Sequence, residues 1–146
     1  MLQTAFAHRF LPADAELIEV CGHAAPLVVT DPVEEYRAVR ERVGLYDFSM
    51  LHKYDVRGRE ALAAVDAAVC RDLTRVAPGR IAYGPVVDDD GGMLDDSTVF
   101  VFAPDHVRVV GGDGVPGAVA AAVAGRDCTA EPIRDRLAHL TLQGPR

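Results

Sequence analysis

The chain has 146 residues, which is the length of about one domain and is enough to bury a hydrophobic core. Its 15 basic and 22 acidic residues give a net charge of −7 without any cluster of Lys and Arg, which argues against a nucleic-acid partner and favours a small or neutral ligand. The three cysteines form no CxxC pair and have no metal-ligand spacing with the histidines, so we expect reduced thiols, no metal and a cytoplasmic location.

In the first half of the chain, hydrophobic periodicity and turn residues predict a hairpin of two strands, a helix, a third strand and a second helix. These are residues 16–20, 26–30, 30–44, 51–56 and 59–70. The first helix has clear ends, because Asp31 can cap it, Pro32 suits its first turn and Glu34 completes a capping box. Gly44 ends this helix, whose apolar residues fall on one face.

In the second half, the apolar period changes to two, which predicts an antiparallel meander of three strands. The elements expected here are strands at 80–87, 93–102 and 106–110, a helix at 115–125 and a last strand at 136–144. Helices and antiparallel strands in separate groups are typical of an α+β fold. We therefore predict a single α+β domain over residues 1–146, with an antiparallel sheet and about three helices.

Two adjacent aspartates, Asp95 and Asp96, open the second strand of the meander. Alternation along a strand sends them to opposite faces, so only one can enter a cavity. Asp96 would share its face with Leu94, Thr98 and Phe100, and Asp95 would share its face with Ser97 and Val99. A carboxylate among apolar neighbours needs a partner, such as a ligand amine, or its pKa rises. The alternative is that Asp96 is a solvated residue next to a turn.

Two other features of the meander have simpler interpretations. The acidic run at 88–90 is predicted to be a turn, because it lacks the ligand spacing of an EF-hand calcium loop. Tyr83 is predicted to lie across from residues 96–98 on the neighbouring strand. From position alone, Tyr83 either packs on the sheet or contacts a ligand.

Three separated segments carry a family resemblance over roughly residues 30–145. They are "EYRAVRERVGLYDFSMLHKYDVRGREAL", "RDLTRVAPGRIAYGPVVDDDGGMLDDSTVFVF" and the terminal "LTLQGPR". Their order and spacing resemble the folate-dependent aminomethyltransferases, a family that includes the glycine cleavage system T-protein and tetrahydrofolate-dependent demethylases. The resemblance implies the fold of the N-terminal folate-binding region and tetrahydrofolate as cofactor.

The resemblance also implies roles for individual residues. Asp96 corresponds to the second aspartate of the family's "G-G-x-x-D-D" hairpin, which faces the folate and accepts a proton near its reacting amine. Tyr83 corresponds to the family's tyrosine in "G-R/K-x-x-Y", and Leu51 to a residue beside the same pocket. With Thr98 and Phe100 on the face of Asp96, these residues make up the expected folate site, and Asp96 is its expected catalytic residue.

This sequence also departs from the family pattern. The segment "SMLHK", residues 49–53, stands where the T-protein has "S-H-M", and together with "DDSTVF" it resembles the demethylase branch. Gly111 stands where family members carry Asn, which implies the loss of one ligand contact. The family's catalytic unit is more than twice as long as this chain. We therefore expect an N-terminal piece of a longer enzyme, or a short member with half of a pocket.

Two functions remain open at this point. The first is the folate-binding portion of a methyl- or aminomethyltransferase, with a small methyl or aminomethyl donor, completed by a second half-domain or a second copy of the chain. The alternative is a non-catalytic folate-binding or interaction module on the same scaffold, and a third possibility is an inactive remnant that only dimerises through its exposed apolar face. The sequence contains no signal-peptide core and no run of about 18 apolar residues, so we expect a soluble protein with no membrane partner.

Overall fold

A computed structural model describes residues 1–10, 14–88 and 90–146 of the chain. The contacts divide the chain into two compact units. Unit 1 comprises Met1–Met50 and Asp135–Arg146, and unit 2 comprises Leu51–Arg134. The single domain expected from the length stays a prediction, and each unit is described below by itself.

Unit 1 contains a hairpin near the start of the chain, as predicted, but its second strand lies earlier than expected. β1 (Leu17–Val20) pairs antiparallel with β2 (His23–Pro26), so residues 26–30 are not the second strand. The turn consists of Cys21 and Gly22, both with positive φ, 50° and 78°. Two consecutive residues of this kind form the tight turn that matches the twist of a hairpin, so pairing starts at His23.

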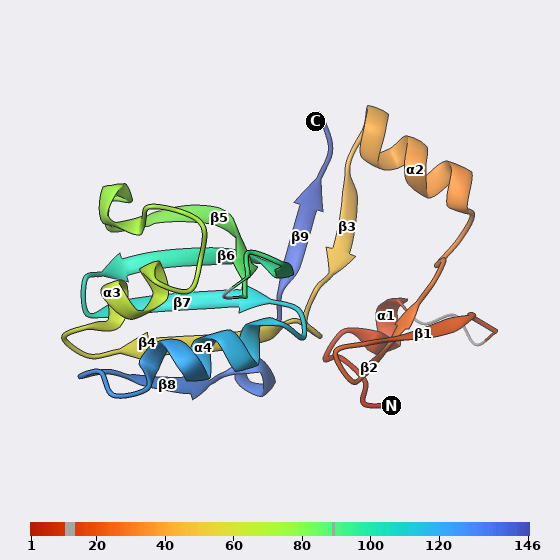
Figure 1. Ribbon diagram of the computed structural model, residues 1–146. Helices are drawn as coiled ribbons and strands as arrows, with labels where there is room; N and C mark the ends of the chain where they lie inside the picture. Colours follow the sequence, from red (N-terminus) through yellow and green to blue (C-terminus); the bar gives the residue numbers. More distant parts are fainter. Residues whose placement is uncertain (11–13, 89) are drawn as a thin grey trace. The chain divides into compact units, whose positions relative to one another are not determined.

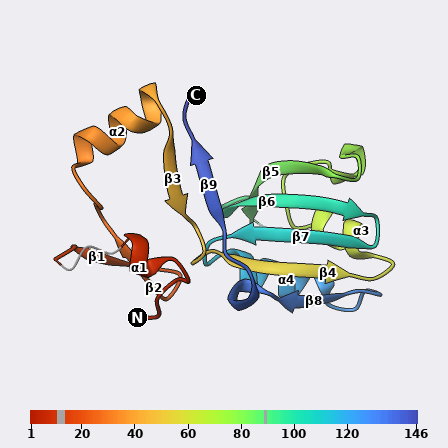
Figure 2. The same cartoon turned by 180° about the vertical axis from the view of Figure 1, so that it is seen from behind.

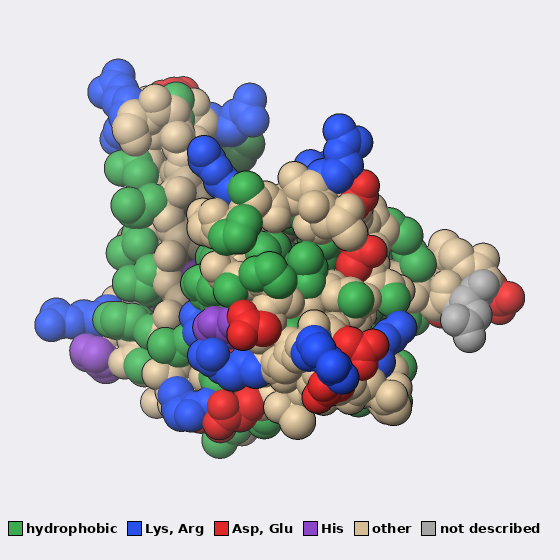
Figure 3. Space-filling view, turned by 90° about the vertical axis from the view of Figure 1, so that its left-hand side faces the viewer, with side chains coloured by type: hydrophobic (Ala, Val, Ile, Leu, Met, Phe, Trp, Pro, Cys, Tyr) green, Lys and Arg blue, Asp and Glu red, His purple; other side chains and the backbone are tan. Residues whose placement is uncertain are grey.

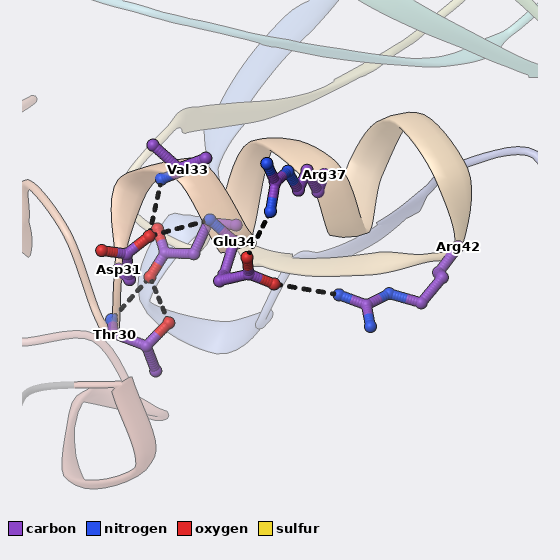
Figure 4. A network of polar contacts seen from close by, with 7 residues as sticks. Thr30, Asp31, Val33, Glu34, Arg37 and Arg42 are labelled. Atoms are coloured by element: carbon purple, nitrogen blue, oxygen red, sulfur yellow. Dashed lines mark hydrogen bonds and ion pairs between the residues drawn. The ribbon is translucent and has the colours of Figure 1, made fainter.

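The helix α2 (Pro32–Glu41) begins where the sequence predicts. Figure 4 shows its first turn, where the Asp31 carboxylate accepts hydrogen bonds from the backbone N–H groups of Val33 and Glu34, each at 3.0 Å. The predicted capping box does not form, because Glu35, one residue beyond the N3 position, accepts at its Oε1 from the N–H of Thr30, which precedes the cap, at 2.6 Å. The expected partner, Glu34, instead forms an ion pair with Arg37.

The far end of α2 differs from the prediction. The helix stops at Glu41, and Gly44 opens the strand β3 (Gly44–Asp47), which pairs antiparallel with β9 (Leu140–Gln143). β9 is shorter than the strand expected at 136–144, and a 3-10 turn, η2 (Arg134–Arg136), ends where that strand was expected to begin. Unit 1 also contains a short helix that the sequence did not predict, α1 (Ala7–Phe10).

Unit 2 is built on a five-stranded sheet of order β5-β6-β7-β4-β8. The strands are β4 (His52–Arg57), β5 (Arg80–Val87), β6 (Met93–Ala103), β7 (His106–Gly111) and β8 (Thr129–Pro132). β5, β6 and β7 form the predicted antiparallel meander, and β4 pairs antiparallel with both β7 and β8. The strand predicted at 51–56 is thus confirmed as a central strand of the sheet.

Two helices lie against one face of this sheet, as Figures 1 and 2 show from opposite sides. They are α3 (Ala61–Asp66) and α4 (Val115–Val123), with the 3-10 turn η1 (Leu73–Arg75) between α3 and β5. The hydrophobic core lies between these elements and the sheet, and its members are Val56, Ala61, Val65, Val69, Leu73, Ala82, Val86, Val99, Val101, Val107, Val109, Val115 and Val119. α3 is shorter than the predicted helix at 59–70.

The opposite face of the sheet, called the outer face below, carries the alternate residues of each strand. On β5 and β6 these include Ile81, Tyr83, Pro85, Leu94, Asp96, Thr98, Phe100 and Phe102. In the described part of unit 2, no helix covers this face (Figures 1 and 2). Large side chains there are exposed, including Tyr83 at 62% and Ile81 at 59%.

The α+β fold is confirmed, with four α-helices and antiparallel sheets in the part of the chain that the structure describes. Among the described residues, no helix is both long and apolar enough to span a membrane. Figure 3 shows one side of the molecule, where acidic and basic side chains are intermingled with hydrophobic ones.

Candidate functional site

The β5–β6 hairpin places Tyr83 and Asp96 close together. In its register, Tyr83 lies opposite Thr98 and Pro85 lies opposite Asp96, so Tyr83 and Asp96 are diagonal neighbours on the same face. The position predicted for Tyr83, across from residues 96–98, is confirmed. The turn is closed by Asp88, whose carboxylate accepts from the N–H groups of Asp90 and Gly92 at 3.0 and 2.7 Å. Asp89 lies outside the described residues.

The two adjacent aspartates point to opposite faces, as strand alternation predicts. Asp95 lies on the core side with the buried Ser97 and Val99. Asp96 lies on the outer face and is exposed, rather than enclosed in an apolar cavity. Its nearest strand neighbours on that face, Leu94 and Thr98, leave the carboxylate accessible to a ligand approaching the sheet.

The Tyr83 hydroxyl donates a hydrogen bond to Asp96 Oδ2. This hydrogen bond raises the pKa of the Tyr83 phenol, with smaller contributions from partial burial and from the negative charge of Asp96. At neutral pH, Tyr83 is therefore a protonated donor that fixes one oxygen of Asp96. The pair presents a fixed carboxylate beside an aromatic ring on an exposed surface.

The other predicted site residues surround this pair to different degrees. Thr98 and Phe100 follow Asp96 along the outer face of β6, and both are half-buried. Leu51 and Asp96 each directly precede the residue that pairs with Gly111 at the end of β7, which is His52 on β4 and Ser97 on β6. Two strand spacings separate them by about 10 Å. The structure thus brings Tyr83, Asp96, Thr98 and Phe100 together and leaves Leu51 at the margin.

A polar cluster on the same face was not predicted. The Asp55 carboxylate on β4 accepts two hydrogen bonds from Arg108 on β7, from Nε at 2.7 Å and from Nη2 at 3.2 Å. Arg57 and His106 also lie within ion-pairing distance of Asp55, at 3.4 and 3.3 Å, although the His106 ring is not aligned for a hydrogen bond. The sequence offered only a weak signal, because β4 carries other charged residues, Lys53 and Arg57, beside Asp55.

This cluster affects the pKa of Asp55 in two opposing ways. Burial alone would raise the pKa of this carboxyl, whose side chain is only 8% exposed. The hydrogen bonds and charge of Arg108, with the neighbouring His106, outweigh burial and hold the pKa below its ordinary value. The Arg108 guanidinium also lies over the Phe102 ring, 5.2 Å from its centre, which fixes an aromatic side chain on the outer face.

The structure explains why glycine occupies position 111, where the resemblance expects Asn. A Cβ atom at Gly111 would lie 2.5 Å from Val115 Cγ2 and 2.6 Å from the backbone oxygen of Asp96. With β6 and α4 at this spacing, no larger side chain fits.

A family model described as the GCVT N-terminal domain matches residues 6–146, nearly the whole chain. The chain belongs to the GCVT N-terminal domain family. Two relatives are named aminomethyltransferase: the protein from Bordetella parapertussis is 35% identical over 98% of this chain, and the one from Thermus thermophilus is 31% identical over 100% of it.

A solved structure shows the same fold. The crystal structure of glycine cleavage system aminomethyltransferase T from Bartonella henselae matches 99% of this chain with a TM-score of 0.76 and 23% sequence identity. The resemblance drawn from the sequence segments is thereby confirmed. This GCVT N-terminal domain spans 41% of the lengths of the Bordetella parapertussis and Bartonella henselae proteins and 43% of the Thermus thermophilus protein.

Proposed function

We propose that this GCVT N-terminal domain is the folate-binding portion of a tetrahydrofolate-dependent one-carbon transferase. The observation that carries the proposal is the Tyr83–Asp96 pair, an accessible carboxylate held by a phenol on the outer face of the sheet. The family membership and the relatives named aminomethyltransferase support it.

The residues on the outer face suit a flat, nitrogen-rich ligand. An aromatic ring system can lie against Phe100 and Tyr83, while its amine groups donate hydrogen bonds to the Asp96 carboxylate. Tetrahydrofolate, when bound, supplies the amine that receives the one-carbon group. These residues fit such a ligand by their negative charge and by their aromatic rings.

Asp96 has a chemical role in this proposal. Its carboxylate accepts the proton of the reacting amine and stabilises positive charge that develops there, which combines general-base and electrostatic catalysis. Tyr83 holds the carboxylate in orientation, because its phenol is protonated at neutral pH and donates a hydrogen bond to Asp96.

The first prediction concerns the substitution Asp96→Asn. Excess tetrahydrofolate at about 100 times its dissociation constant should stabilise the unsubstituted chain by about 2.7 kcal/mol, a rise of several degrees in the melting temperature. Asp96→Asn should lose most of this rise, because an amide cannot offer the ligand amine a charged acceptor. Thermal unfolding by circular dichroism, with and without the ligand, measures both values.

Asp105→Asn is the matched control, because Asp105 is an exposed aspartate in the turn at the other end of β6. This variant should keep the full ligand-induced rise. If the unsubstituted chain shows no rise at saturating tetrahydrofolate, or Asp96→Asn rises as much as Asp105→Asn, the proposed site is wrong.

We further propose that the donor is a methylated compound, as in the demethylase branch. The segment at 49–53 and the "DDSTVF" sequence of β6 support this choice over an aminomethyl donor. Incubation of the chain and tetrahydrofolate with O-, S- or N-methyl donors, followed by mass spectrometry of the folate, should detect a methylated product. Product from an aminomethyl donor alone contradicts the branch, and folate binding without any product favours the non-catalytic module.

A further inference from the structure

We propose that Asp95 is the positioning residue of this site, because its two carboxylate oxygens hold the backbone of Asp96 and the loop at 111–114 at the same time. The two aspartates then have different roles, because Asp96 faces the ligand and Asp95 sets the direction in which the Asp96 side chain projects. The inference rests on the proposed function for its ligand-binding measurement, whereas its structural measurement is independent of it.

The hydrogen bonds of Asp95 join two segments that are distant in sequence. Its Oδ1 accepts from the backbone N–H of Asp96 at 2.8 Å, and its Oδ2 accepts from the N–H of Gly114 at 2.9 Å. The β6–β7 ladder ends at the pair Ser97 and Gly111, so it offers no opposite residue to Asp96. Asp95 supplies an acceptor where the ladder stops, and thereby satisfies a backbone donor next to the site.

Close packing around the Asp95 carboxylate shows that the loop is built against it. A Cβ atom at Gly112 would lie 2.9 Å from Asp95 Oδ2, and one at Gly114 would lie 2.8 Å from Asp95 Cβ and 2.7 Å from the backbone oxygen of Leu94. Because side chains at these positions would meet β6, only glycine allows the loop to approach so closely.

The same carboxylate supports the start of α4. Gly114 is the N-cap residue of this helix and has no side chain to cap the first turn, and its own backbone N–H donates to the carboxylate from β6. The negative charge of Asp95 thus lies at the positive end of the helix. Asp113 holds the other side of the loop through a contact of 3.0 Å between its Oδ1 and His52 Nε2 on β4. The loop is therefore fixed to both neighbouring strands.

Asparagine cannot replace Asp95 in this arrangement. Each of the two oxygens faces a backbone N–H donor, whereas the amide of Asn has one acceptor and one donor group. In Asp95→Asn, the amide NH₂ group would therefore face one of the two backbone N–H groups, and two hydrogen-bond donors would repel each other. The substitution removes the double contact with almost no change in shape.

The Tyr83 phenol reports whether Asp96 is held in place. Its pKa is raised mainly because it donates a hydrogen bond to Asp96. When Asp96 changes direction, this hydrogen bond weakens and the Tyr83 titration moves down toward the ordinary value of about 10. A substitution that loosened only α4 would leave this titration unchanged.

The experiment is a pH titration of the full chain labelled with ¹³C at the tyrosine Cζ atoms, with Tyr83→Phe identifying the Tyr83 signal. In Asp95→Asn, we expect the Tyr83 midpoint to fall and the Kd for tetrahydrofolate to rise about tenfold. Asp105→Asn should change neither. A Tyr83 midpoint that is unchanged in folded Asp95→Asn overturns the inference.

A second variant covers the case in which Asp95→Asn fails to fold. Gly112→Ala keeps the Asp95 charge but pushes its carboxylate, which lies 2.9 Å from the new Cβ position, and should lower the Tyr83 midpoint in the same direction. An unchanged midpoint in this variant also overturns the inference. If the unsubstituted chain binds no tetrahydrofolate, the proposed function fails, yet the Tyr83 titration still decides the role of Asp95.

Discussion

Asp55→Ala should lower the free energy of unfolding by about 3 kcal/mol. The substitution leaves Arg108 without the carboxylate that accepts its two hydrogen bonds at 2.7 and 3.2 Å. Arg108 is only 25% exposed, so water replaces the lost partner poorly. Urea unfolding followed by circular dichroism measures the loss, and Asp105→Asn, which removes an exposed carboxylate, should change the stability little.

The effect of Asp55 should depend on pH in a defined direction. The folded-state pKa of this carboxyl is lowered, so its stabilisation is present above the ordinary pKa of about 3.9 and is lost as the pH falls through the lower folded value. The difference in stability between the unsubstituted chain and Asp55→Ala should therefore be constant near neutral pH and shrink below about pH 4. A difference that grows on acidification contradicts the assigned network.

Gly58→Ala should also destabilise the chain by about 3 kcal/mol. Gly58 turns the chain from β4 toward α3 with a φ of +134°, which side chains rarely allow. Its added Cβ would lie 2.5 Å from the backbone oxygen of Asp127 and 2.5 Å from Cys128 Cα. Because both are backbone atoms, the clash cannot be relieved by rotating a side chain.

Gly117→Ala is the matched control for this prediction. Gly117 lies within α4, and a Cβ there meets nothing within 4 Å. The same substitution should therefore stabilise the chain by about 0.5–1 kcal/mol, because alanine loses less backbone entropy in a helix. Chemical unfolding of both variants gives the comparison. Equal changes in the free energy of unfolding of Gly58→Ala and Gly117→Ala would show that the close approach of residues 127 and 128 to Gly58 does not limit the side chain at this position.

Most of the fold of unit 2 was predictable because its strands repeat apolar residues with period two and are separated by clear turns. For example, β5 matches its predicted range, 80–87.

In unit 1, Gly44 shows where prediction from local sequence patterns fails. A glycine after a periodic helix usually marks its end, but here Gly44 starts a strand that pairs with β9, about a hundred residues later in the chain. Local patterns carry no information about such distant pairing.

The candidate site was predictable only in part. Alternation along β6 separated Asp95 from Asp96, and the resemblance assigned Asp96 a role. No local pattern indicated that Asp95 contacts Gly114 or that Arg108 holds Asp55, because these contacts join residues 19 and 53 positions apart. Tertiary pairing of charged groups depends on sheet order, which residue spacing does not determine.

The most direct test of the central claim is a titration of the ¹⁵N-labelled chain with tetrahydrofolate, followed by backbone amide chemical shifts. If the outer face binds folate, saturable shifts should concentrate on Asp96, Thr98 and Phe100, with Tyr83 on the paired strand, and Asp96→Asn should remove them. Shifts that do not saturate, or that concentrate on α2 of unit 1 instead, would contradict a folate site on this sheet.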